Sequence, residues 1–366
     1  MIHKWAFFFL GALGIANSTC FADKFPQSAI EISAGGQGTS WNRSQNFKIG
    51  NTSQWGDAVL NGFPGQENSL SYNRDHGGGG YQIEAAVRGK TWDYETGLRQ
   101  SFVQTHEAKT EVPGTGAGLL TEMAFIDGQA HGTSRTFGYF VSAATVAGQS
   151  RPGIAALDYR LMAFEIPFYA VRSLWNRGKF RSHFFAGPVY SLFSQKLRVN
   201  TSGTNAITGG STSSETTEKL TESLFGARLG LRGIFSLPAG FFLRFEQTSG
   251  LFVSRGRLSA EQEITQGSGN AGGGVTFSNL NETITTRDTN ISQVPHFSTS
   301  VETGRHFGER VTLIFFGQFE QWLNLSRIEN PIVSATLRCL VNGPALLRRD
   351  ENLHAFSLGG KIVVEL

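Results

Sequence analysis

The sequence is poor in cysteine, methionine, charge and long apolar runs. Of its 366 residues only 2 are cysteine and 3 are methionine, and 17% are charged, against roughly 25% in an average soluble protein. After the N-terminal region no segment reaches the roughly 18 consecutive apolar residues of a membrane-spanning helix, which excludes a helical membrane protein. The net charge of +3 is too small to suggest a nucleic-acid binder.

What the chain has instead is glycine and phenylalanine. It contains 45 glycines and 30 phenylalanines. Glycine destabilises a helix interior by about 1 kcal/mol relative to alanine, which argues against a helical enzyme. A disordered chain would lack the aromatic residues. The composition therefore predicts an all-β protein with many turns.

The N-terminus has the three parts of a secretory signal peptide. Lys4 supplies the positive charge, residues 5–16 form a short apolar run, and a small polar stretch ends at Ala22. We expect residues 1–22 to be removed by cleavage after Ala22, leaving residues 23–366 as the mature chain. Cleavage would also remove Cys20, so that Cys339 would have no partner for an intramolecular disulfide.

Apolar and polar side chains alternate at the C-terminus as in a membrane-spanning strand. In residues 354–366 one face carries Phe356, Leu358 and Ile362, and the other carries Ser357 and Lys361. Similar alternation recurs at residues 80–88, 92–102, 223–237, 241–255 and 310–323. A soluble β-sandwich alternates too, but charges deep within strands and aromatics near strand ends favour an outer-membrane barrel. We therefore predict a transmembrane antiparallel β-barrel over residues 23–366, located in a bacterial outer membrane.

The connections between these segments alternate in length, as in outer-membrane barrels. The predicted long outer loops are residues 39–79, 106–156, 199–221, 256–293 and 324–353, and the short periplasmic turns are 89–90, 172–178, 237–240 and 307–309. This pattern predicts ten strands. Residues 136–146 are either a further strand, which with a partner makes twelve, or an element folded within a loop.

Several short segments in the second half of the chain resemble a known family. They are Leu157-Asp158-Tyr159 with Glu165, residues 183–195, 224–231 and 240–256, Val294-Pro295 with Glu302, residues 316–324 and the terminal strand. Their order is similar to that in the pore-forming outer-membrane family typified by the Legionella major outer membrane protein. The resemblance implies a barrel that conducts ions or small hydrophilic solutes, with outer-membrane lipid as its surroundings. A homo-oligomer is compatible with this reading.

The charged residues on the polar faces are the candidate site. Seven cations and seven acids are predicted to line the lumen: Arg88, Arg99, Arg160, Arg228, Arg232, Arg244, Lys361, Glu84, Asp93, Glu95, Asp158, Glu246, Glu320 and Glu365. They either set the field along an open pore or pair across strands and plug a narrow lumen. Balanced charge predicts weak ion selectivity.

Motifs of enzymes are absent or poor. The glycines of residues 77–80 and 114–118 lack the following Lys-Ser/Thr of a phosphate loop and are interpreted as loop glycines. There is no His-Glu-x-x-His and no cysteine pair for a metal, and the histidines are scattered, which suggests solvated positions or strand ends. We predict a porin-like channel for passive diffusion, without cofactor, metal or enzymatic activity. The alternative is a closed barrel that acts as a surface adhesin or structural protein through its long loops.

Overall fold

The computed structural model describes the strands of the chain and its shortest connections. The described residues are 30–42, 47–54, 68–72, 76–89, 91–104, 108–112, 117–120, 140–142, 153–204, 211–266, 269–271, 275–277, 280–308, 310–328 and 348–366. The predicted signal peptide and its cleavage position lie outside these residues. Within the described part of the chain, no helix is long and apolar enough to cross a membrane.

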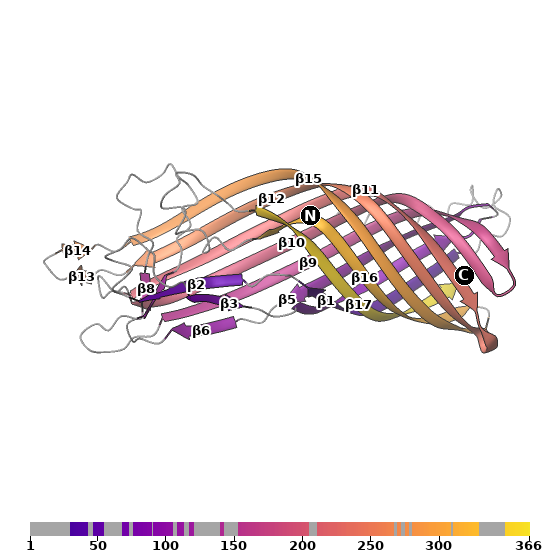
Figure 1. Cartoon of the computed structure of the whole chain (residues 1–366), viewed down its shortest axis with the longest axis horizontal. Helices are drawn as coiled ribbons and strands as arrows, with labels where there is room; N and C mark the ends of the chain where they lie inside the picture. The colour runs from indigo at the N-terminus through magenta and orange to yellow at the C-terminus, as the bar shows by residue number, and fades with distance from the viewer. Residues whose placement is uncertain are drawn as a thin grey trace.

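Ten antiparallel strands form a closed barrel (Figure 1). Each pairs with the next along the chain, and the last pairs with the first in register from Glu31 opposite Glu365 to Asn42 opposite His354. This confirms the predicted fold class and the count of ten. The barrel strands are β1 (Ile30–Asn42), β4 (His76–Val87), β5 (Asp93–Gln104), β9 (Gly153–Arg177), β10 (Phe180–Thr204), β11 (Ser211–Ser236), β12 (Phe241–Gln266), β15 (Leu280–Phe307), β16 (Val311–Ile328) and β17 (Arg348–Glu365).

The outward face carries an apolar band next to the short turns. On β12 the band runs from Phe241 to Val253, and the next outward side chains, Arg255 and Arg257, are charged and exposed. Thirteen residues of a strand tilted by about 45° match the roughly 9–11 residues needed to cross a bilayer, with a margin at each end. Because these apolar side chains stay exposed on the barrel surface, lipid is their natural surroundings.

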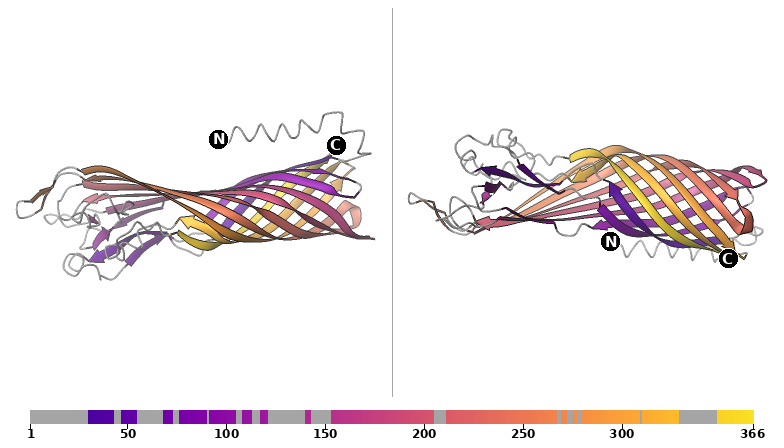
Figure 2. Two further views of the ribbon diagram at one scale, coloured as in Figure 1. Left: turned by 90° about the horizontal axis from the view of Figure 1, so that it is seen from above. Right: turned by 60° about the horizontal axis from the view of Figure 1, so that its bottom comes forward.

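Five consecutive strands are much longer than a membrane requires. Strands β9 to β12 and β15 have 25 to 28 residues each, which corresponds to roughly 80 Å along a strand. About half of that length therefore projects beyond the apolar band, away from the short turns, as one continuous sheet (Figure 2). We refer to this part of the five strands as the outer extension.

Short additional strands lie at the outer end of the barrel. They are β2 (Phe47–Gln54), β3 (Asn68–Tyr72), β6 (Ala108–Val112), β7 (Ala117–Leu120), β8 (Phe140–Ser142), and the separate pair β13 (Gly269–Ala271) and β14 (Val275–Phe277). β8 pairs with β7 and touches β10 at a single position, Ser142 opposite Thr204. The element predicted within residues 136–146 is therefore not a barrel strand where it is described; its other residues lie outside the described part.

The predicted long loops include residues that belong to barrel strands in the structure. Residues 199–204, 211–221, 256–266 and 280–293 belong to barrel strands, as do 324–328 and 348–353. The pairing of β10 with β11 continues to Thr204 opposite Ser211. Serine and threonine pair well across strands, and beyond the membrane neither face of the sheet needs apolar side chains. A polar composition that is typical of loops is therefore compatible with strands here.

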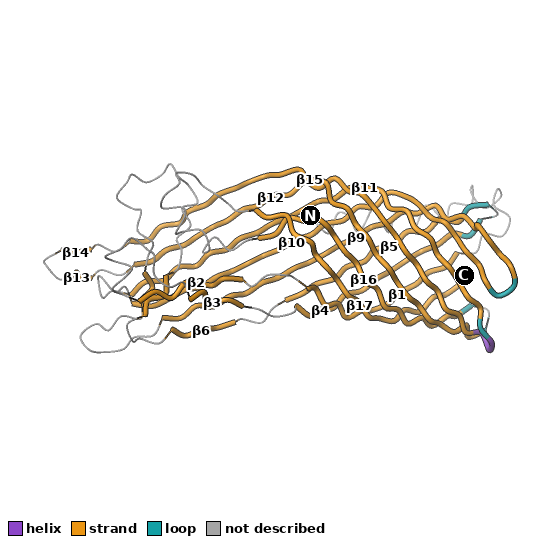
Figure 3. The backbone as a smooth tube through the Cα atoms, viewed as in Figure 1, coloured by secondary structure: helices purple, strands orange, loops and turns teal. Residues whose placement is uncertain are grey.

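Short turns gather at the opposite end of the barrel, where Figure 3 shows the one-turn 3-10 helix η2 (Pro238–Gly240). The turn predicted at residues 237–240 lies where expected; of the turn predicted at 307–309, Phe307 ends β15, Gly308 is a turn residue and residue 309 lies outside the described part. The turn predicted at residues 172–178 is wrong, because β9 continues to Arg177 and only Gly178 and Lys179 form the turn. Gly178 has a φ of 60°, a conformation that glycine adopts without strain.

The four glycines of residues 77–80 are not loop glycines. They lie in β4, where Gly78 and Gly80 pair with Val103 and Ser101 of β5. A Cβ atom at either glycine would overlap a backbone carbonyl oxygen of β5. Close approach of two strands thus requires glycine here, and the run has no relation to phosphate binding.

Candidate functional site in the lumen

Nearest the short turns, two arginines share one carboxylate inside the barrel. Arg88 donates to Glu95 at 2.9 Å, and Arg232 donates to the two oxygens of Glu95 at 2.8 and 2.9 Å. Arg88 also binds Glu31 at 2.6 Å. Arg232 continues the network to Glu246 at 2.8 Å. Side chains from β1, β5, β11 and β12 are thereby tied together.

A second group of ion pairs lies one layer deeper. Arg228 makes a bidentate pair with Glu165, at 2.9 and 2.7 Å, and donates to the hydroxyl of Tyr169 at 3.0 Å. Arg99 binds Glu320 at 2.5 Å. Between β5, which carries Arg99, and β16, which carries Glu320, lie three other strands. This contact therefore spans the lumen.

Lys361 completes the network on the remaining wall. Its Nζ lies 3.0 Å from Glu84 and 3.1 Å from Glu302. Arg244 lies 3.1 Å from the second oxygen of Glu302. Pairing of this kind is needed because an isolated charge would be costly inside a narrow lumen.

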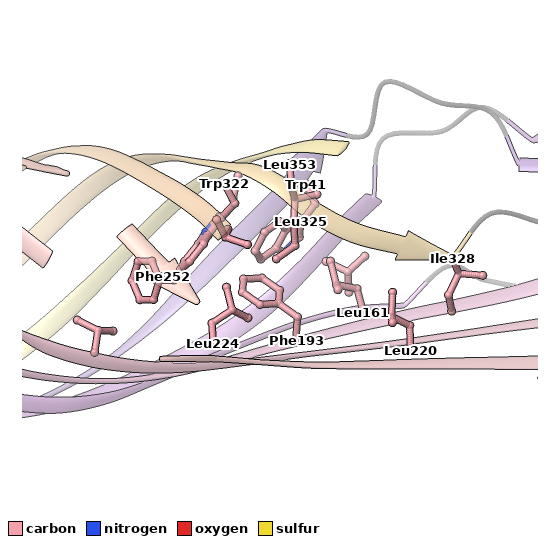
Figure 4. Close-up of a cluster of buried hydrophobic side chains, with 14 of the residues drawn as sticks. Trp41, Leu161, Phe193, Leu220, Leu224, Phe252, Trp322, Leu325, Ile328 and Leu353 are labelled. Carbon is pink, nitrogen blue, oxygen red and sulfur yellow. The ribbon is translucent and has the colours of Figure 1, made fainter. Parts of the chain in front are cut away.

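Aromatic side chains from opposite walls meet above these ion pairs. The ring of Phe193 on β10 lies 5.1 Å from that of Trp322 on β16 and 6.2 Å from that of Trp41 on β1, centroid to centroid. Phe252 lies 5.2 Å and His296 4.1 Å from Trp322. Figure 4 shows Trp41, Phe193, Phe252 and Trp322 together inside the barrel. We call Trp41, Phe193, Phe252, His296 and Trp322 the aromatic layer.

Direct hydrogen bonds join the same two walls beyond the aromatic layer. The side chain of Gln195 on β10 donates to the carbonyl oxygen of Ser326 on β16 at 2.8 Å and accepts from the Ile328 amide at 3.3 Å. Glu222 on β11 accepts from the Ser326 amide at 3.0 Å. Leu161, Leu197 and other aliphatic side chains fill the space around these contacts. At this level side chains cross the lumen from wall to wall.

The open space in the lumen lies on the short-turn side of the aromatic layer. A cavity of about 520 Å³ is lined there by the ion-pair network and by residues of the short-turn end, including Arg181, His306 and Arg310. A second space, bounded by Trp41, Phe193 and Trp322, measures about 10 Å³, no more than a single water occupies. Among the described residues, the space between these three rings is thus far smaller than the cavity.

The structure places twelve of the fourteen predicted lining residues in the lumen. Arg160 and Asp158 are the exceptions. They flank Tyr159, which is fully buried on the inner face of β9, and so lie on the outer face, where they pair with each other at 3.1 Å. The alternation was misjudged there because residues 157–161 lie outside the apolar band. The twelve are Arg88, Arg99, Arg228, Arg232, Arg244, Lys361, Glu84, Asp93, Glu95, Glu246, Glu320 and Glu365.

Sequence reasoning missed several charged or titratable residues of the lumen, among them Glu31, Glu165, Glu222, Glu302 and His296. Glu31, Glu165 and Glu302 are central to the network. Glu165 has apolar neighbours on both sides in the sequence, so no alternation marks it as inward-facing. Glu302 follows the outward Val301, and this alternation could have identified it. His296 was expected to be solvated or near a strand end, but it is fully buried against Trp322.

The chain is weakly similar to several solved outer-membrane proteins. No family model and no curated protein matches the chain. Among solved structures it is similar to the outer membrane protease OmpT from Escherichia coli, with 9% identity, a TM-score of 0.40 and coverage of 94% of this chain and 99% of that one. It is also similar to an anion-selective porin from Comamonas acidovorans, with 8% identity, a TM-score of 0.21 and coverage of 93% and 100%.

A third match is the TodX deltaS2S3 mutant monoaromatic hydrocarbon channel, with 7% identity, a TM-score of 0.25 and coverage of 93% of this chain and 91% of that one. The closed barrel with its outward apolar band is itself of the outer-membrane type of β-barrel. Similarity this weak carries no ligand, substrate or residue role from these proteins to this chain.

The exclusion of enzymatic activity made from the sequence does not stand. One of the solved barrels that match over nearly the whole of both chains is a protease. The absence of a recognisable soluble-enzyme motif therefore does not exclude an enzyme in a chain with this fold. Within the described ranges, no three His, Cys, Asp or Glu side chains gather as they would around a metal ion.

Proposed function

We propose that the chain is an outer-membrane barrel with a closed lumen, which acts at the cell surface through its outer extension. The observation that carries this proposal is the contact of Phe193 with Trp322 across the lumen, with ring centroids 5.1 Å apart. The hydrogen bonds of Gln195 to the opposite wall support it. Of the two functions that the sequence allows, the geometry favours the closed surface protein over the porin.

The small number of strands also favours a closed lumen. Side chains just fill the interior of an eight-stranded barrel, whereas porins that leave an aqueous channel have 16 to 18 strands. A ten-stranded lumen lined by Trp, Phe and paired Arg has little cross-section left for solutes. In such a lumen the paired charges stabilise the barrel wall and have little part in ion selection. Passive diffusion of hydrophilic solutes would require these side chains to move aside.

One edge of the outer extension is suited to a surface role. β15 pairs with β12 from Leu280 to Arg305, but its pairing with β16 begins only at His296. Among the described residues, no strand pairs with the other edge of β15 over residues 280–288 and 290–295. Such an edge presents backbone amide and carbonyl groups to which an extended segment of a partner can add.

The proposal includes export through the signal peptide and a shared origin with a known family. Removal of residues 1–22 after Ala22 would deliver the chain to the periplasm for insertion. We propose that the chain shares ancestry with the family of the Legionella major outer membrane protein, which it resembles. A closed lumen would separate this chain from the pore activity that the family implies.

A shortened β10–β11 hairpin tests the surface role. Asn200 lies opposite Glu215, so deletion of residues 201–214 and insertion of Asn-Gly between these two keeps the remaining register intact. The full chain, displayed on a non-adherent bacterial strain, is expected to increase attachment to epithelial cells and immobilised matrix glycoproteins. The shortened variant is expected to lose most of that gain.

The control keeps the outer extension and changes the opposite end. Phe307→Ala lies at the short-turn rim, and we expect it to attach like the full chain. A heat-shifted band on an unboiled gel must show that all three barrels fold. Equal attachment by the full chain, the shortened variant and cells without the protein would contradict a surface role of the extension.

A further inference from the structure

The outward rim at the short-turn end combines aromatic rings with arginine. Large rings are exposed there on several strands and turns, for example Trp92, Trp175 and Phe307, which are 37%, 52% and 51% exposed. Rings at this level match the aromatic girdle of membrane barrels, which sits among the lipid headgroups. The rim therefore lies at the depth of the headgroups of the periplasmic leaflet.

Three arginines at this rim lie over aromatic faces. The Cζ atom of Arg172 is 5.5 Å from the centre of the Trp92 ring, and that of Arg177 is 5.2 Å from Trp175. Arg305 lies between two rings and is 5.1 Å from Phe241 and 5.2 Å from Phe307. Stacking on a ring fixes the plane of a guanidinium while leaving its N–H groups free to donate.

These three arginines have no acidic partner among the described residues, in contrast to the arginines inside the barrel. The acids at the same end, including Glu31, Glu95 and Glu365, line the inner cavity. The described outward side chains of the rim carry positive charge alone. Arginine without a carboxylate, held at headgroup depth by a ring, is suited to bidentate binding of phosphate.

We propose that Arg172, Arg177 and Arg305 form binding sites for the phosphate groups of anionic phospholipids in the periplasmic leaflet. We refer to these three residues as the rim arginines. They continue the apolar band that meets the acyl chains, so that one lipid can contact ring and guanidinium together. This proposal is independent of whether the lumen is open or closed.

Native mass spectrometry of the full chain, refolded in detergent, tests the proposal directly. Lipid adducts are counted with phosphatidylglycerol and with phosphatidylcholine at equal concentrations. We expect phosphatidylglycerol to be retained preferentially. Near a charged lipid surface one arginine contributes about fivefold to affinity, so each site of the triple variant R172Q/R177Q/R305Q should bind phosphatidylglycerol roughly fivefold more weakly.

Two control variants separate phosphate recognition from net charge. R160Q/R255Q/R257Q removes three exposed outward arginines beyond the apolar band and should retain phosphatidylglycerol like the unchanged chain. R172K/R177K/R305K keeps the charge but loses the bidentate geometry, and an intermediate affinity is expected. A heat-modifiability gel confirms that each barrel is folded.

Added inorganic phosphate distinguishes a lipid site from a general anion site. With acyl chains contributing, millimolar phosphate should leave the phosphatidylglycerol adducts in place. Loss of the adducts at that concentration would overturn the assignment to lipid. Equal retention of the two lipids by the unchanged chain, or equal losses in the rim and outer triple variants, would overturn the proposal as well.

Discussion

Removing the aromatic layer is expected to convert a silent barrel into a conducting one. In the triple variant W41A/F193A/W322A, the rings that meet across the lumen are lost. Water then reaches from the cavity of about 520 Å³ toward the outer extension. Planar bilayer recordings should change from no current to discrete, flickering steps. The small size expected for these steps reflects the side chains that still cross the lumen, namely the ion pair of Arg99 with Glu320 on one side of the lost rings and the hydrogen bonds of Gln195 on the other.

Three phenylalanines on the lipid face supply the matched control. Phe225, Phe315 and Phe356 are 66%, 59% and 50% exposed on the outward face. The variant F225A/F315A/F356A should insert and remain silent. Truncation of large buried side chains costs about 3–5 kcal/mol each, so the lumen variant must first show a heat-shifted band. A folded W41A/F193A/W322A barrel without current would contradict the aromatic layer as the seal.

Loss of Arg228 is expected to give the largest destabilisation of any single charge substitution in the lumen. Arg228→Met removes both hydrogen bonds to Glu165, a carboxylate that is buried in the unchanged chain, and leaves Arg99 at 3.7 Å as its remaining cation. Breaking a buried pair by removing one partner costs about 3–5 kcal/mol. Urea titration in lipid vesicles, followed by tryptophan fluorescence, should show a correspondingly lower midpoint.

Two further variants decide whether the effect comes from the unpaired charge. The double variant R228M/E165M removes both charges and should recover most of the lost stability, because replacing a whole buried pair by apolar residues is often neutral. Arg198→Met breaks an exposed pair with Glu215 and should cost less than about 1 kcal/mol. If R228M and R198M unfold at the same urea concentration, the lumen network is not a stabilising feature.

The part of the fold that meets lipid could be predicted from the sequence. In β17, Phe356 and Leu358 point outward while Ser357 and Lys361 point inward, as the alternation predicts. The signal is strong because one face must be apolar and the other borders a polar lumen, so each residue type has one acceptable side. The inward position of twelve predicted charges follows from this rule, whereas the count of ten strands follows from the alternation of long and short connections.

The outer extension could not be predicted by the same rule. In residues 211–222 of β11 the sequence is rich in Ser, Thr and Glu, and both faces of the sheet are beyond the membrane. Without lipid on one side, the period-two pattern loses its apolar half, and the composition looks like that of a loop. What holds these residues in a strand is the continuous backbone pairing with β10 and β12.

The aromatic filling of the lumen has a signal in the sequence. Phe316 and Trp322 fall on the face of β16 that the alternation otherwise gives to polar residues. Both are buried inside the barrel, at 6% and 2% exposure. Their partners, such as Phe193, lie on strands that come near only after the barrel closes. Aromatics on an inner face thus indicate a filled lumen, but the contacts depend on the register of the whole barrel.

Single-channel recording of the unchanged mature chain, refolded in detergent and inserted into a planar bilayer, tests the closed lumen most directly. A heat-modifiability gel of the same sample shows whether the barrel has folded. We predict a band that shifts on boiling, together with no discrete conductance. Reproducible conductance steps from the heat-modifiable protein would contradict the closed lumen and would favour the porin.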